Sequence, residues 1–186
     1  MSTVTASTSS SLGAAASLRR LYFVRFGFAL VWAGLLAATA SGLGPVSVAL
    51  LVLYPLFDGV AAIVDARSSK ATGPALGLYA NIVISWATAV GLAFAAGSGI
   101  PAVLRVWGAW AVVSGLLQLA VGVIRRHLGG GHWPMIVSGA ISTVAGTSFV
   151  LQAAQESASL VSLAGYATLG GLFFLASALR LGRVTR

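Results

Sequence analysis

The chain has 186 residues, of which 58% are hydrophobic and only 8% are charged, and its mean hydropathy is +0.97. A water-soluble domain of this length would need far more polar surface, so the composition predicts an integral membrane protein. The net charge of +8 does not indicate nucleic-acid binding, because the basic residues lie at the ends of apolar runs and form no patch interleaved with exposed aromatics. The lack of cysteine excludes disulfides, thiolate metal sites and cysteine nucleophiles.

The N-terminal segment 1–20 is rich in Ser, Thr and Ala and contains no apolar core. We expect it to form a disordered cytoplasmic tail. A cleaved signal peptide would carry its basic and apolar regions before a site of small residues, and here that order is reversed. The first apolar run is therefore expected to stay in the protein as a membrane anchor.

Six apolar runs follow, each long enough for a transmembrane helix. A helix rises about 1.5 Å per residue, so about 20 residues cross a hydrocarbon core of about 30 Å. The predicted helices are 22–40, 46–64, 76–95, 101–124, 133–151 and 160–181. Turns rich in Gly, Ser and Pro follow the first and third runs, which favours antiparallel hairpins. We therefore expect an all-α integral membrane domain of six transmembrane helices over 21–182, with a cytoplasmic C-terminal tail at 183–186.

A short motif repeats at an interval of 56 residues, in the second helix of each predicted hairpin. In each copy an aromatic residue is followed five positions later by glycine: Tyr54 and Gly59, Trp110 and Gly115, Tyr166 and Gly171. A fixed period of this length is typical of a repeated supersecondary unit. The sequence predicts three parallel copies of one helical hairpin, about a pseudo-threefold axis along the membrane normal. The expected copies span 21–67, 76–126 and 132–182.

The basic residues are distributed unequally between the two predicted sides of the membrane. Of the 11 Lys and Arg residues, only Arg105 belongs to the side opposite the chain ends. Positive charge accumulates on the cytoplasmic side of membrane proteins, so both termini are predicted to be cytoplasmic. The expected location is the bacterial cytoplasmic membrane.

Glycines and aromatics in the predicted helices suggest how the helices pack. Glycines spaced by seven residues lie on one helix face and are expected to form packing seams; they are Gly27 and Gly34, Gly108, Gly115 and Gly122, and Gly139 and Gly146. Tyr22, Tyr79, Trp107, Trp110 and Trp133 include expected interface anchors.

A candidate polar site lies inside the predicted bilayer. A carboxylate such as Asp58 costs about 2.5–3.5 kcal/mol at the centre of a membrane helix, so it should face protein or water. Arg25 lies at a similar depth in the first helix and is its expected partner. Asn81 occupies the position in the third helix that Arg25 has in the first. Ser114 matches Asp58 in the fourth helix, and Gln118 follows one turn later on the same face.

Familiar catalytic and metal-binding patterns are missing from the sequence. His127 and His132 have no carboxylate or cysteine nearby, which makes a weak metal site. The sequence contains no glycine-rich phosphate loop followed by lysine, and no pair of deep carboxylates beside a histidine. We therefore expect no cofactor, no metal and no enzymatic activity.

The Tyr-Pro-x-x-Asp block at Tyr54–Asp58, the following Asp65-Ala66-Arg67 and the repeated hairpins together resemble the HdeD-like family of small bacterial membrane proteins. The resemblance covers roughly residues 20–182. It implies six membrane spans and a cytoplasmic-membrane location, and one branch of the family is associated with acid resistance. The family offers no established catalytic residues.

Three functions remain open at this point. The leading hypothesis is a non-enzymatic multi-pass protein that contributes to acid or envelope stress tolerance. The second is a conduit for protons or small solutes with Asp58 as the titrating group. The third is a membrane scaffold that associates through glycine-rich helix faces. The expected partners are the lipid bilayer and either another membrane protein or a second copy of the chain.

Overall fold

The computed structural model describes residues 2–68, 76–125 and 133–184. Within these residues the chain forms six α-helices and one short 3-10 helix. The elements are α1 (Ser2–Thr39), α2 (Pro45–Ser68), α3 (Leu76–Ala95), η1 (Ala96–Ser98), α4 (Ile100–Arg125), α5 (Trp133–Gln152) and α6 (Val161–Val184). All six α-helices contain a stretch long and apolar enough to cross a membrane. The protein is therefore a multi-pass helical membrane protein, as the composition predicts.

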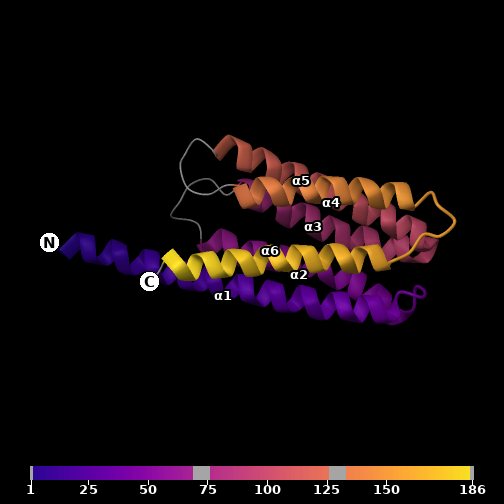
Figure 1. Ribbon diagram of the computed structural model, residues 1–186, viewed down its shortest axis with the longest axis horizontal. Coiled ribbons are helices and arrows are strands. Elements are labelled where there is room, and N and C mark those ends of the chain that lie inside the picture. Colours follow the sequence, from indigo (N-terminus) through magenta and orange to yellow (C-terminus); the bar gives the residue numbers. More distant parts are fainter. Residues whose placement is uncertain (1, 69–75, 126–132, 185–186) are drawn as a thin grey trace.

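Helix α1 begins much earlier than the sequence predicts. It extends back to Ser2, so residues 2–20 are helical although a disordered tail was expected there. This segment contains no proline, and the run Ala14–Ala16 consists of the strongest helix former. Once a helix is nucleated in the bundle, extension adds one hydrogen bond per residue, so it can continue into a weakly hydrophobic segment. Figure 1 shows this part of α1 projecting beyond the bundle.

The helices lie side by side along the long axis of the molecule, and both chain ends lie at the same end of it (Figure 1). The turns that follow α1, α3 and α5 lie at the opposite end. Gly99 makes the turn between η1 and α4 with a φ of 93°, a left-handed conformation that favours glycine. In the turn between α1 and α2, the Ser47 hydroxyl donates to the carbonyl oxygens of Thr39 and Gly42 at 3.1 and 3.0 Å. Each hairpin is therefore closed by a short, hydrogen-bonded turn.

The core at the centre of the bundle is rich in aromatic side chains. Trp107 packs against Trp32, Tyr54 and Trp110 with ring centroids 5.3–5.5 Å apart. The indole N–H of Trp32 donates to the backbone carbonyl of Leu50 at 2.6 Å. The prediction of interface anchors is wrong for Trp107 and Trp110, which are 0% and 7% exposed because this core takes them in. Trp133 is 73% exposed, as an interface anchor requires.

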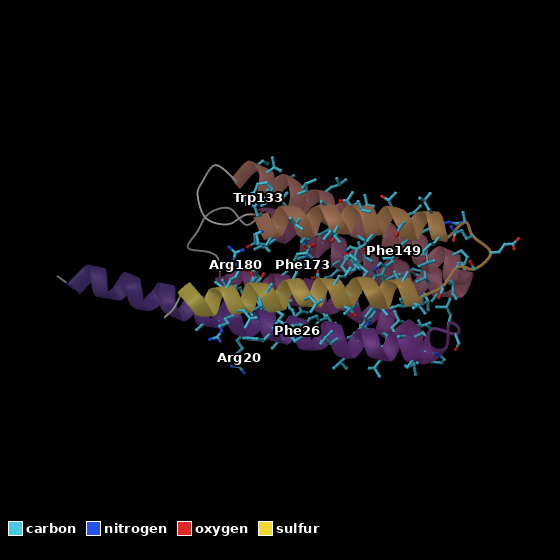
Figure 2. The ribbon with its side chains drawn as sticks, viewed as in Figure 1. Arg20, Phe26, Trp133, Phe149, Phe173 and Arg180 are labelled. Atoms are coloured by element: carbon cyan, nitrogen blue, oxygen red, sulfur yellow. The ribbon has the colours of Figure 1, made fainter. Side chains whose placement is uncertain are left out.

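Large apolar side chains cover the outer surface of the bundle. Phe94, Ile124 and Val144 are each more than two-thirds exposed, and Figure 2 shows side chains projecting outward along the helices. A water-soluble monomer rarely exposes so much apolar surface. In a bilayer these side chains contact lipid, so the surface agrees with a membrane-embedded bundle.

Glycine brings α4 and α5 into direct backbone contact. A Cβ atom added to Gly139 would lie 2.6 Å from the carbonyl oxygen of Gly115, and one added to Gly146 would lie 2.6 Å from that of Gly108. The predicted packing seams on α4 and α5 are confirmed. The seam predicted on α1 is wrong, because Gly27 and Gly34 are exposed and an added Cβ would meet nothing within 4 Å.

Positions 56 residues apart on α2, α4 and α6 have similar surroundings. Leu51, Trp107 and Leu163 are all nearly inaccessible. The glycines of the repeated motif are also buried, and each lies against a helix of a different hairpin. Gly59 faces Ser85 and Trp86 of α3, Gly115 faces Gly139 and Thr143 of α5, and Gly171 faces Phe26 and Ala29 of α1.

Candidate functional site

Asp58 lies in α2 one turn after a proline that interrupts the backbone hydrogen bonds of the helix. Pro55 is fully buried inside α2, and because it has no N–H it leaves the carbonyl of Leu51 without its helical partner. The Asp58 side chain is 15% exposed. A charged group at this depth needs partners to offset its loss of hydration.

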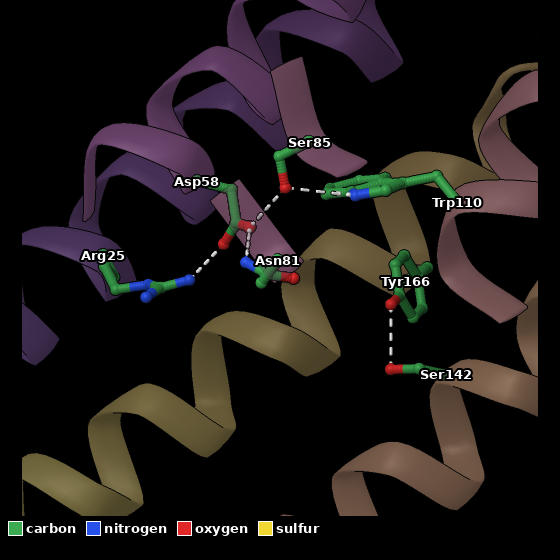
Figure 3. A network of polar contacts seen from close by, with 7 residues as sticks. All are labelled: Arg25, Asp58, Asn81, Ser85, Trp110, Ser142 and Tyr166. Atoms are coloured by element: carbon green, nitrogen blue, oxygen red, sulfur yellow. Dashed lines mark hydrogen bonds and ion pairs between the residues drawn. The ribbon is translucent and has the colours of Figure 1, made fainter. Parts of the chain in front are cut away.

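The Asp58 carboxylate has three partners, and they come from two neighbouring helices (Figure 3). The guanidinium of Arg25 in α1 forms an ion pair and donates a hydrogen bond to Oδ1. In α3, the amide of Asn81 donates to Oδ2 at 2.8 Å and the hydroxyl of Ser85 donates to the same oxygen at 3.0 Å. Both carboxylate oxygens are therefore satisfied, and the group ties α2 to α1 and α3.

Arg25 is held from a fourth helix as well. Its side chain is 12% exposed, and its guanidinium carbon lies 4.2 Å from the centre of the Phe174 ring in α6. A cation over an aromatic face is attracted by the electron density of the ring, more strongly where water is excluded. The aromatic ring thus occupies one face of the guanidinium while Asp58 binds its edge.

The polar network continues from Ser85 into the aromatic core. The indole N–H of Trp110 in α4 donates to the Ser85 hydroxyl oxygen at 3.3 Å, and the Ser85 hydroxyl in turn donates to Asp58. A second polar contact between helices appears in the same view (Figure 3): the Tyr166 hydroxyl in α6 donates to the Ser142 hydroxyl in α5 at 2.9 Å. Side-chain hydrogen bonds therefore join α1 to α4 through α2 and α3, and join α5 to α6.

Three of the five predicted site residues meet, and two do not. Arg25, Asp58 and Asn81 are brought together as predicted. The Ser114 hydroxyl is buried and has no hydrogen-bond partner among the described residues. Gln118 is exposed at the edge of the α4–α5 seam, where its Cβ lies 3.2 Å from the place of a Cβ on Gly139.

Sequence reasoning missed Ser85, Trp110 and Phe174 as members of the site. Ser85 follows Asn81 by one helical turn and so faces the same way, a signal that was present in the sequence. Trp110 was expected at the membrane surface, and its polar contact depends on how α4 packs in the bundle. The position of Phe174 beside Arg25 depends on α6 packing along α1, which nothing in the local sequence indicates.

The network has the chemistry of a structural clamp between α1, α2 and α3. No group of three or more His, Cys, Asp or Glu side chains suited to a metal ion occurs in the part of the chain that the structure describes. His127 and His132, the weak metal pair of the sequence, lie outside the described residues. The groups that surround Asp58 are a cation, an amide and a hydroxyl, all of which stabilise its negative charge.

No protein-family model, curated protein or solved structure matches this chain.

Proposed function

We propose that this chain is a non-enzymatic six-span protein of the bacterial cytoplasmic membrane that contributes to tolerance of acid or envelope stress. The observation that carries the proposal is the complete pairing of Asp58, whose two oxygens are bound by Arg25, Asn81 and Ser85. A carboxylate used in this way holds helices together and is not presented to a substrate. The likeness to HdeD-like proteins supports the link to acid stress.

The proposal includes a threefold architecture in which three parallel hairpins have both chain ends in the cytoplasm. The recurrence of buried positions at Leu51, Trp107 and Leu163 and the matching contacts of the motif glycines support the repeat. The single outward arginine, Arg105, supports the orientation. Reporter fusions at the C-terminus and in the turn 153–160 test it. A C-terminal reporter active on the outer side of the membrane would contradict the proposed orientation.

Survival at low pH tests the acid-tolerance proposal. A deletion strain is compared with strains that carry the wild type, Asp58→Asn or Glu156→Gln, the last being a matched control because Glu156 is exposed at the other end of the bundle. We expect the wild type and Glu156→Gln to restore survival and Asp58→Asn to fail, because asparagine cannot form the ion pair with Arg25. Equal survival of all strains, including the deletion, removes the acid-tolerance function.

A second candidate function is proton conduction with Asp58 as the titrating group. The observation that favours it is a carboxylate inside a membrane-spanning helix whose side chain is still 15% exposed. The test measures proton flux into liposomes that contain the purified protein. Conduction requires flux above that of empty vesicles and a loss of that flux in Asp58→Asn.

A third candidate function is a membrane scaffold, which would use the outward-facing glycines of α1 to contact a partner. The glycine seams of α4 and α5 are used inside the bundle, whereas Gly27 and Gly34 face outward. Crosslinking in membranes followed by mass spectrometry tests this alternative with Gly34→Leu as the variant. A chain that stays monomeric, or crosslinks that Gly34→Leu leaves unchanged, count against it.

A further inference from the structure

Outside the Asp58 network, an open groove runs along the start of the first membrane span. It has a volume of about 470 Å³ and is lined by Ala16, Arg19, Arg20, Phe23 and Val24. All five lining residues lie on one face of α1, since they follow the helical spacing of three and four.

The two arginines of the groove lie near the start of the first candidate membrane span. The membrane-spanning part of α1 begins at Ala16, so Arg19 and Arg20 fall in its first turn and a half. Phe23 and Val24 lie about 6 Å deeper along the helix. They are 38% and 50% exposed, which leaves them free to contact an apolar chain. The groove thus changes from cationic to apolar in the direction that leads into the bilayer.

Arg19 is positioned by its neighbours. Its guanidinium lies 5.6 Å from the centre of the Phe23 ring. It also packs across α6 at Gly182, where an added Cβ would come within 3.0 Å of the guanidinium carbon. Arg20 is exposed, and Figure 2 shows it pointing away from the bundle near the end where the chain termini lie. None of the described residues that line the groove is acidic.

We propose that this groove binds an anionic phospholipid, with its phosphate at Arg19 and Arg20 and an acyl chain over Phe23 and Val24. A guanidinium matches phosphate because it can donate two parallel hydrogen bonds. A free phosphate ion would use the arginines and leave the exposed apolar floor in contact with water. The pairing of cationic and apolar surfaces therefore favours the lipid, and this site is independent of the function proposed for Asp58.

Native mass spectrometry of the full-length protein in detergent, titrated with dioleoyl phosphatidylglycerol against dioleoyl phosphatidylcholine, tests the proposal. The double variant Arg19→Gln with Arg20→Gln removes the charges, and Arg105→Gln is the matched control, an exposed arginine at the other end of the bundle. We expect the wild type and the control to prefer the anionic lipid. Each basic residue near an anionic surface contributes roughly a fivefold preference, so the double variant should lose about 25-fold.

Three results would overturn the proposal. The first is an unchanged lipid preference in the double variant, and the second is an equal loss in Arg105→Gln. The third is displacement of the lipid by millimolar inorganic phosphate, which would assign the arginines to a soluble anion. If circular dichroism shows that the double variant is misfolded, Arg20→Gln alone is used, because Arg20 is exposed. We expect a loss of about fivefold for that single variant, and no loss would overturn the proposal equally.

Discussion

Removing one partner of the Arg25–Asp58 pair is expected to destabilise the protein as much as removing both. The pair lies between α1 and α2 with side chains only 12% and 15% exposed. In Arg25→Leu the carboxylate keeps its two neutral donors, Asn81 and Ser85, but loses its counter-charge. In Asp58→Leu the guanidinium keeps the Phe174 ring but loses its counter-charge. Each single variant therefore leaves an uncompensated charge in the membrane interior.

The size of the effect follows from the cost of a buried, unpaired charge. Breaking a buried ion pair by removing one partner costs about 3–5 kcal/mol, and the residual exposure of these side chains favours the lower value. We expect about 3 kcal/mol for each single variant. The double variant Arg25→Leu with Asp58→Leu has no charge at this site, and it loses the hydrogen bonds that Asn81 and Ser85 donate to Asp58. We expect it to cost no more than about 3 kcal/mol, whereas independent effects would give about 6 kcal/mol.

The free energy of unfolding is measured by equilibrium denaturation in mixed detergent micelles, followed by the fluorescence of the five tryptophans. Arg105→Leu and Glu156→Gln form a control pair at exposed positions, and their effects should be small and additive. If the losses in the two single variants of the ion pair simply add in the double variant, the two side chains are not coupled and the clamp described for Asp58 is refuted.

Three further pairs of variants test the packing of the bundle. Gly139→Ala is expected to lower stability in thermal unfolding by about 1–3 kcal/mol, because the added Cβ would clash with the backbone of α4. Its control, Gly34→Ala, has open space around it and should be neutral or slightly stabilising. Trp32→Phe removes the hydrogen bond to Leu50 and leaves a smaller ring in the aromatic core, so it should cost about 1–3 kcal/mol in the same assay. Trp133→Phe, at an exposed site, should leave the melting temperature unchanged. Tyr166→Phe and Ser142→Ala should each lower stability by roughly 0.6–1.7 kcal/mol, because each removes the same hydrogen bond. The double variant should lose no more stability than one single variant. A fully additive loss would contradict the contact.

Much of the fold could be predicted because membrane spans are encoded in local composition. The six apolar runs, the turns around Gly42 and Gly99 and the approximate lengths of α2 to α6 all depend on hydrophobicity and breakers within short windows. The start of α1 could not be predicted in this way. Whether residues 2–20 are helical depends on continuation from a folded helix, and their own composition indicates only that they cannot form a core.

The candidate site was predictable where depth and repeat position gave the answer. Arg25 and Asp58 enter the membrane from the same side at similar depth, and Asn81 follows from the interval of 56. Repeat position wrongly placed Ser114 in the polar site, because its hydroxyl has no hydrogen-bond partner among the described residues. The burial of Trp107 and Trp110 could not be separated from an interface position, since tryptophan suits both. Only the three-dimensional packing of α4 shows that both tryptophans lie in the core.

The close packing of α1 along α6 has a consequence for how the chain assembles. α1 contacts α6 more extensively than it contacts α2, its own hairpin partner, and Arg25 completes its surroundings with Phe174. The contacts of α1 with α6 therefore cannot form until α6, the last helix in the chain, has been synthesised and inserted. A chain interrupted before α6 would lack the Phe174 ring beside Arg25 and would leave the α1 surface at Ala29 uncovered.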